Sequence, residues 1–345
     1  MSALHRVYEL DTPIIPLHQQ PAALIDLALA RGVNLDRLLR GTRLFQDQLL
    51  EPGRRITPDQ FYQLMDNGIR LLDNPDTAFL FGQRILPGHY GAVSEQLRQA
   101  HTLHEALECL TTGAALFSPL LAPRLVLDDH YGYLFWVDTC RPGHQRRFLV
   151  EAAMTAVYAL SRQLFASKLP WECRFSYPQP RHIEQYWLHL GEQIRFDQAM
   201  DMMRIPRQYL HHPLTPGSGL TAQMIRQQAQ GQLQQLSHIQ GFLQHLYLLL
   251  ETTLKVENPR QERIAAQLGM STSGLKRLLK KHHTSYQQQL DQVRKLTALQ
   301  LIQWKQFSNE DVARLLHIND AANFRRCFKR WTGLAPNQLR AQWVK

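Results

Sequence analysis

The chain has 345 residues, of which 44% are hydrophobic and 20% are charged. That length favours two domains, and the near-average composition argues against wholesale disorder, collagen and coiled-coil rods. The net charge of +10 is unevenly placed, because residues 255–345 hold 17 Lys and Arg against 6 Asp and Glu, while the preceding residues hold 22 against 23. A polyanion, either nucleic acid or anionic lipid, is therefore the expected partner of the last quarter.

Neither a membrane span nor an export signal is predicted. The longest apolar runs are short, such as 246–250, and Asp11, His18 and Gln19 fall where a signal peptide needs an unbroken apolar core. We therefore expect a cytoplasmic protein that does not enter the membrane.

No metal and no cofactor are expected. The cysteines are more than 30 residues apart and form no C-x-x-C pair, which favours reduced thiols at Cys109, Cys140, Cys173 and Cys327. His101 and His104 have the spacing of a metal pair, but Thr102 with Glu105 forms a capping box that explains the segment better. The common nucleophile, phosphate-binding and metalloprotease motifs are absent from the sequence.

The first part of the chain is predicted to be an α+β domain with helices around a small antiparallel sheet. Helical periodicity is found at 22–39, 59–72, 94–110 and 147–165. Strand patterns are found in a hairpin at 124–139, with a turn at Asp128, Asp129 and His130, and again at 171–177.

A stretch rich in Pro, Gly and Ser at 211–219 predicts the exit from this domain. A Gln-rich helix is expected at 220–236, and glutamines such as Gln227 and Gln228 are interpreted as its solvated face. Apolar residues at spacings of three and four from Ile239 onward predict a packed helix after it.

The last 90 residues contain an internal duplication. Residues 264–271 match 312–319 at an offset of 48, and alternate residues of 275–279 match those of 324–328 at an offset of 49. Each copy predicts a helix, a tight turn and a basic second helix, at about 261–281 and 309–331. Start and turn signals lie at Asn258, Pro259 and Gln261, at Gly269 and Ser271, and at Ser308 and Asp311. Two basic helix-turn-helix units indicate DNA binding.

Apolar stripes separate the inward from the outward faces of the two basic helices. The side chains expected to pack inside are Leu275, Leu278 and Leu279 in the first and Phe324, Phe328 and Trp331 in the second. The side chains expected to contact DNA are Ser273, Lys276, Arg277, Lys280, Lys281, Asn323, Arg325, Arg326 and Lys329. Arg277 and Arg326 suit paired hydrogen bonds to guanine, whereas Lys280 and Lys281, nearer the helix end, suit phosphate.

A helix between the two copies is predicted to start at Ser285, with Gln288 as its capping partner, and to run to about Trp304. Twenty residues at about 1.5 Å each give a rod of roughly 30 Å. That length is close to the roughly 34 Å between successive major grooves on one face of B-form DNA.

These segments resemble a known family. The run from Gly269 to Leu279, Thr284 to Tyr286 and above all the closing segment 328–340 (FKRWTGLAPNQLR) resemble the DNA-binding domain of the AraC/XylS family of bacterial transcription regulators. The resemblance covers about 240–343. More loosely, 190–216 resembles the end of the sensor domain in the ornithine-utilisation-regulator branch. It implies an N-terminal domain that binds a small-molecule effector, RNA polymerase as a partner, and activation of transcription.

The sequence departs from the family pattern in three places. His317 and Ile318 replace Gly-Phe at the second turn, where we expect the histidine to adopt a left-handed conformation. Leu296 replaces an acidic residue in the helix between the two copies. Ala321 and Ala322 are small where larger polar side chains are common, so base reading by the second helix is expected to depend on Arg325 and Arg326.

The sequence does not identify the effector-binding site. Weak candidates are His89 and Tyr90, beside a loop-to-helix junction, and Arg146 and Arg147, which would suit a carboxylate if they faced a cavity and are otherwise surface residues. Three parts of the chain are predicted: a sensing and dimerisation domain at 1–216, a helical linker at 217–238 and a domain that binds double-stranded DNA at 239–345. The first domain is expected to form a homodimer. Two alternatives to a ligand-controlled regulator stay open: an architectural DNA-binding protein and a DNA-directed enzyme.

Overall fold

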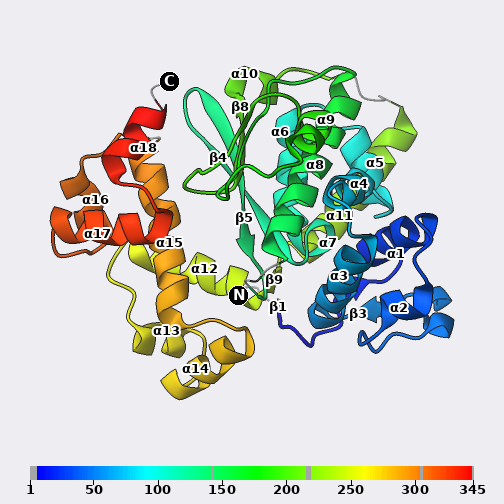
Figure 1. Cartoon of the computed structure of the whole chain (residues 1–345), viewed down its shortest axis with the longest axis horizontal. Helices are drawn as coiled ribbons and strands as arrows, with labels where there is room; N and C mark the ends of the chain where they lie inside the picture. Colours follow the sequence, from blue (N-terminus) through cyan, green and yellow to red (C-terminus); the bar gives the residue numbers. More distant parts are fainter. Residues whose placement is uncertain (1–5, 142, 144, 215–218, 304–305, 344–345) are drawn as a thin grey trace. The chain divides into compact units, whose positions relative to one another are not determined.

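The computed structural model describes residues 6–141, 143, 145–214, 219–303 and 306–343. The chain divides into two compact units (Figure 1). The first unit is made of Met1–Arg174, Gln179–Arg195 and Asp201–Phe242, and the second of Phe175–Pro178, Phe196–Met200 and Leu243–Lys345. As predicted, an α+β domain is followed by a helical one. No helix among the described residues is long and apolar enough to cross a membrane.

The first unit contains short strands among many helices. Its strands are β1 (Arg6–Tyr8), β2 (Ile15–Pro16), β3 (Arg55–Ile56), β4 (Leu121–Leu127), β5 (Tyr131–Asp138), β6 (Glu172–Arg174), β7 (Ile194–Arg195), β8 (Met202–Pro206) and β9 (Ile239–Gly241). Its helices are α1 (Gln20–Ala30), α2 (Leu35–Leu39), the 3₁₀ helix η1 (Gln46–Leu50), α3 (Pro58–Leu72), α4 (Thr77–Ile85), α5 (Ala92–Arg98), α6 (Leu103–Thr112), α7 (Ala114–Phe117), α8 (Arg146–Phe165), α9 (Ile183–Leu190), α10 (Arg207–Leu210) and α11 (Leu220–Leu236).

The helices of the second unit are α12 (Phe242–Leu254), α13 (Gln261–Gln267), α14 (Thr272–Lys281), α15 (Tyr286–Gln303), α16 (Asn309–Leu315), α17 (Ala321–Thr332) and α18 (Pro336–Trp343). Helix α13 packs against α14, and α16 packs against α17. Helix α15 lies between these two pairs in the chain and contacts α17 and α18.

A five-stranded sheet with the order β4-β5-β8-β6-β7 forms the centre of the first unit. The predicted hairpin is confirmed as β4 and β5, and Asp128 stabilises its turn by accepting hydrogen bonds from the backbone N–H groups of His130 and Tyr131 at 2.7 and 2.6 Å. The strand predicted at 171–177 is shorter than expected, because β6 pairs with β8 over Glu172–Arg174 alone.

Two of the predicted helices are each split into two. The pattern at 22–39 gives α1 and α2, separated at Gly32, whose φ of 77° ends the first helix, and Asn34 caps the second. The pattern at 94–110 gives α5 and α6, because Thr102 accepts a hydrogen bond from the N–H of Glu105 at 3.1 Å and starts a new helix. This confirms the predicted cap, which places His101 before the helix.

Helices α4 and α8 pack unusually closely. A Cβ at Gly82 would lie 2.4 Å from the carbonyl oxygen of Ala152, so only glycine permits this approach. Small residues of α8, Ala153 and Ala156 among them, share a cavity with Leu121 of β4 and Trp136 of β5. Helices α4 and α8 are therefore held against one face of the sheet.

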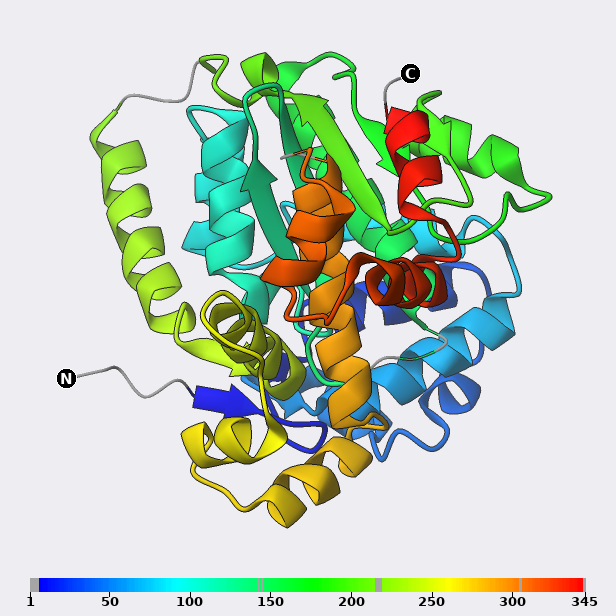
Figure 2. The same cartoon turned by 90° about the vertical axis from the view of Figure 1, so that its left-hand side faces the viewer.

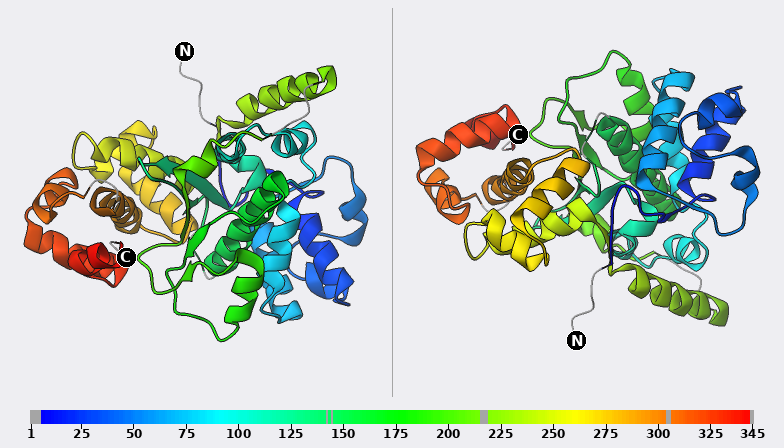
Figure 3. Two further views of the ribbon diagram at one scale, coloured as in Figure 1. Left: turned by 90° about the horizontal axis from the view of Figure 1, so that it is seen from above. Right: turned by 90° about the horizontal axis from the view of Figure 1, so that it is seen from below.

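The chain leaves the first unit through α11 and β9. Helix α11 packs against α5 and α6 and lies along the outer edge of the unit in Figures 2 and 3. The helix predicted from Ile239 was wrong at its start, because Ile239–Gly241 pairs in parallel with Arg6–Tyr8 and α12 begins at Phe242. The limits 1–216, 217–238 and 239–345 stay predictions, while the division between the compact units falls after Phe242.

A buried carboxylate joins three strands of the sheet. Glu172 on β6, whose side chain is 11% exposed, pairs with its neighbour Arg174 and with Arg204 of β8 at 2.6 Å, and lies 3.5 Å from Arg195 of β7. Burial alone would raise the pKa of Glu172, but the charges of Arg174 and Arg204 outweigh it and hold that pKa below its usual value. Burial in turn lowers the pKa of Arg174 to about 10.

We expect Glu172→Gln to lower the stability of the first unit by about 3 kcal/mol at neutral pH, because it leaves buried arginines without their carboxylate. Since the folded-state pKa of Glu172 is lowered, its contribution is full above the usual glutamate pKa and is lost as the pH falls through the folded value. Urea unfolding from pH 7 to pH 3 should show the difference from wild type shrinking on acidification. The exposed Glu184→Gln is the control and should change little; an equal effect of both would contradict the prediction.

Candidate DNA-binding interface

The first helix-turn-helix unit consists of α13, a short turn and α14. Gly269 has a φ of 70° and ends the first helix, and the side chain of Ser271 accepts a hydrogen bond from the N–H of Gly274 at 3.1 Å, as predicted. The predicted start at Asn258 and Pro259 was wrong, since α13 begins after Arg260, which is extended and offers no side-chain cap.

The second helix-turn-helix unit consists of α16, a turn and α17. Ser308 caps α16 through the N–H of Asp311 at 3.1 Å, as predicted. His317 has a φ of 53° and confirms the expected left-handed turn. Its Nε2 also lies 3.1 Å from the carbonyl oxygen of Leu254 at the end of α12. The sequence reasoning missed Asp320, which caps α17 through the N–H of Asn323 at 2.7 Å; an Asp just before the helical run was the available signal.

Helix α15 connects the two units. Ser285 and Gln288 form the predicted reciprocal cap, at 2.9 and 3.3 Å. The 18 residues of α15 correspond to a rod of about 27 Å at 1.5 Å each, and the predicted end at Trp304 lies outside the described residues. Leu296, which replaces an acidic residue, is buried in the face that α15 turns inward.

Residues 258 and 259 are fastened to α15 instead of capping α13. The hydroxyl of Tyr286 donates to the carbonyl oxygen of Pro259 at 3.0 Å, and the guanidinium of Arg294 donates to the side-chain oxygen of Asn258 at 3.0 Å. Partial burial lowers the pKa of Arg294. These contacts fix the path of the chain from α12 into the first helix-turn-helix unit.

The predicted inward stripes of α14 and α17 are observed. Leu275, Leu279, Phe324 and Phe328 are buried, while Leu278 and Trp331 are half-buried. Cys327 is half-buried beside them.

The predicted DNA contacts lie on the opposite faces of α14 and α17. The exposed ones are Ser273, Lys276, Arg277, Lys280, Lys281, Arg325, Arg326 and Lys329, and Asn323 is half-buried. Three basic positions recur at the same offset in the two helices: Lys276 with Arg325, Arg277 with Arg326, and Lys280 with Lys329. At the fourth pair, Lys281 with Arg330, the guanidinium of Arg330 forms an ion pair with Asp291 of α15 at 3.1 Å.

Arg340 on α18, the last residue of the family-like closing segment, has a structural role. Its guanidinium donates to the carbonyl oxygen of Phe307 at 2.6 Å and to the side-chain oxygen of Asn309 at 2.9 Å. Arg340 therefore secures the start of α16 and, with it, the position of the second helix-turn-helix unit.

The four effector candidates do not share one site in the first unit. His89 is exposed and Tyr90 is 3% exposed, and both line a groove beside α11. Arg146 donates to Asp138 at 2.8 Å and lies 3.6 Å from Asp201, so its charge is neutralised within the protein. Arg147 pairs with Glu151 at 2.8 Å and borders a polar cleft of about 560 Å³.

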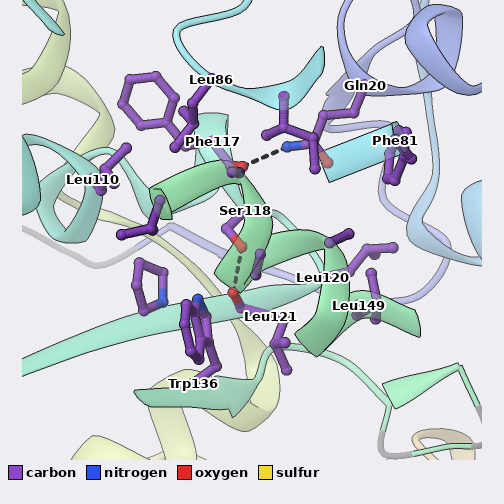
Figure 4. Close-up of a pocket in the computed structure, with 16 residues that line it drawn as sticks. Gln20, Phe81, Leu86, Leu110, Phe117, Ser118, Leu120, Leu121, Trp136 and Leu149 are labelled. Atoms are coloured by element: carbon purple, nitrogen blue, oxygen red, sulfur yellow. Dashed lines mark hydrogen bonds between the residues drawn. The ribbon is translucent and has the colours of Figure 1, made fainter. Parts of the chain in front are cut away.

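An apolar cavity of about 40 Å³ lies between α4, α7, α8 and the β4–β5 hairpin (Figure 4). Phe81, Leu149 and Trp136 line it, and the amide of Gln20 donates to the carbonyl oxygen of Phe117 at its edge. The cavity has room for only a few water molecules, so a larger ligand requires its lining side chains to move.

Two family models match two separate parts of this chain. Residues 32–214 match the family model described as the arabinose-binding domain of AraC transcription regulator, N-terminal, and residues 264–342 match a helix-turn-helix domain. The ornithine utilization regulator of Pseudomonas aeruginosa is 30% identical over 92% of this chain and 94% of its own length. An uncharacterised HTH-type transcriptional regulator of Mycobacterium tuberculosis is 22% identical over 91% of this chain and 93% of its own length.

Among solved structures, the transcriptional regulator CdpR from Pseudomonas aeruginosa is similar, with a TM-score of 0.45 and 21% identity over 93% of this chain and 98% of that one. A sensor-like α+β unit followed by two helix-turn-helix units defines a DNA-binding transcription regulator with a domain of the ligand-binding type. The chain belongs to the AraC family of transcription regulators. This membership removes the DNA-directed enzyme from the alternatives.

The second turn generates a prediction about His317. Its left-handed backbone costs about 1 kcal/mol, and its hydrogen bond to Leu254 returns a similar amount. We expect His317→Ala to destabilise α16 and α17 by about 1 kcal/mol, and His317→Gly, which loses the bond but relieves the backbone, to stay close to wild type. Hydrogen exchange of the α16 and α17 amides measures both; a glycine variant less stable than the alanine variant would refute this account.

Proposed function

We propose that this regulator reads two successive major grooves of double-stranded DNA, with α14 in one and α17 in the other. The observation that carries the proposal is the repeated basic face, in which Lys276, Arg277 and Lys280 on α14 recur as Arg325, Arg326 and Lys329 on α17. Similar outward side chains on two recognition helices predict similar contacts with two half-sites. The spacer α15, about 27 Å long, supports a spacing near one helical turn of DNA.

Within each helix, the position of a basic side chain suggests its role. Arg277 and Arg326 occupy the middle of the outward faces, where a guanidinium can donate two hydrogen bonds to guanine. Lys280 and Lys329, one turn later, suit phosphate oxygens. Ser273 on α14 corresponds to Ala322 on α17, so the two helices differ at the start of their outward faces. The two half-sites are therefore expected to be related but not identical.

We further propose that the first unit binds a small-molecule effector and that the protein activates transcription in the cytoplasm, as a homodimer formed through the first unit and in contact with RNA polymerase. The match to a domain of the arabinose-binding type supports effector control. A relative named for ornithine utilization supports a small metabolite as the effector. The alternative, an architectural protein without ligand control, predicts weak sequence preference instead.

The two central arginines provide the test of specific reading. After bound sequences are selected from a random DNA library, Arg277→Ala should weaken binding to the selected site by about 1 to 3 kcal/mol and relax the preference at one or two base pairs of one half-site. Arg326→Ala should do the same in the other half-site. The measurement is binding to the site and to its single-base variants at fixed salt.

Lys280→Ala is the matched control for these arginines. It should weaken binding to all sequences alike and reduce the salt dependence, as expected for a phosphate contact. If Arg277→Ala and Arg326→Ala lowered specific and nonspecific binding equally, the proposed base readers would be wrong and the architectural alternative would be favoured.

A further inference from the structure

A groove runs along α11 in the first unit. Two adjoining hollows of about 370 and 630 Å³ form it, and they share the residues Ile14, Arg55, Gln232 and Leu236. One wall is α11, and the opposite wall is made of residues 13–19 and the start of β3. All of these residues belong to the first unit.

The charge of the groove has one sign. Its lining includes Arg55 together with His18, His89 and His238, and none of the described residues that line it is Asp or Glu. The polar cleft beside Arg147 differs, because Asp66 and Glu151 line it as well. The groove is thus the hollow that suits an anion.

Arg55 is held in place by the backbone around it. Strands β2 and β3 pair Pro16 with Arg55 and Ile15 with Ile56, and the guanidinium donates to the carbonyl oxygen of Ile14 at 3.0 Å. Arg55 is exposed and lines both hollows, and in the part of the chain that the structure describes this is the one hydrogen bond of its guanidinium, so its other N–H groups are available to a ligand. A guanidinium presented in this way matches the geometry of a carboxylate.

The opposite wall adds neutral donors and apolar contacts. Gln228, Gln232 and Gln235 line the groove from one side of α11, whereas Gln227 on the same helix does not line it. The Gln-rich helix therefore has a groove face as well as the solvated face expected from the sequence. Ala115 and Leu116 of α7 and Leu236 of α11 supply apolar surface beside these amides.

We propose that this groove binds an organic carboxylate with a short apolar body, its carboxylate on Arg55 and its body against Leu116 and Leu236. The inference rests on the proposed function, in which the first unit senses an effector. The apolar cavity near Trp136, at about 40 Å³, is too small for such a molecule without rearrangement.

The position of the groove explains how a bound ligand would influence the second unit. A carboxylate that bridges residues 13–19 and α11 holds that helix in position. Helix α11 ends at Leu236, and β9 begins at Ile239, directly before the chain enters α12. Ligand occupancy therefore stabilises the segment that precedes the DNA-binding unit.

Calorimetry of the full chain with hexanoate, and with hexylamine as the charge-reversed probe, tests the inference. We expect hexanoate to bind and hexylamine not to bind. Arg55→Gln should weaken hexanoate binding at least tenfold, and Gln232→Glu, which adds a negative charge that repels the carboxylate, should have a similar effect. The matched controls Arg84→Gln, on exposed α4 surface, and Gln227→Glu, outside the groove on α11, should bind as wild type. Hexanoate should also slow hydrogen exchange at 220–241.

Three results would overturn the inference: wild-type affinity of both groove variants for hexanoate, equal binding of hexylamine, or no binding of any straight-chain acid from butanoate to decanoate. DNA binding is measured on the same samples. If the wild type binds DNA sequence-specifically but binds no carboxylate, only the groove inference is rejected. If the wild type shows no sequence-specific DNA binding, the proposed function is rejected.

Discussion

Both helix-turn-helix units depend on one backbone constraint, a residue with positive φ between their two helices. Gly269 meets it in the first unit and His317 in the second, at 70° and 53°. Without this reversal the chain would continue the first helix, and the apolar stripe of the second helix would not reach the core. The glycine adopts the conformation at little cost, whereas the histidine gains a hydrogen bond to the end of α12. The same turn is thus supported by conformational freedom in one copy and by a contact in the other.

Local patterns in the sequence predicted the DNA-binding unit well, because caps, turns and apolar stripes act over a few residues. Ser271, Ser285 and Ser308 cap helices as expected. The errors occurred where distant segments meet. The residues from Ile239 fit a helix by periodicity but pair with β1, and Asn258 fits a cap but binds Arg294 of α15. A pattern of about ten residues carries no information about a partner that lies far away in the sequence.

The first unit was predictable in class and less so in its sites. Its hairpin and its long helix α8 follow from strong local patterns. By contrast, Arg146 and Arg147 are adjacent in sequence and both open α8, yet one is neutralised by Asp138 and Asp201 and the other borders a cleft. The Gln-rich helix presents a similar case, since only its position against residues 13–19 distinguishes the glutamines that line the groove from those that do not.

The pairing of β1 with β9 delays the completion of the first unit during synthesis. Arg6 and Ile239 are register partners, so β1 leaves the ribosome long before its partner β9 has been synthesised. During that interval it is an unpaired edge, available to other chains. Completion of the first unit and emergence of α12 are then almost simultaneous. The helices of the second unit emerge only after β9, the strand that completes this pairing.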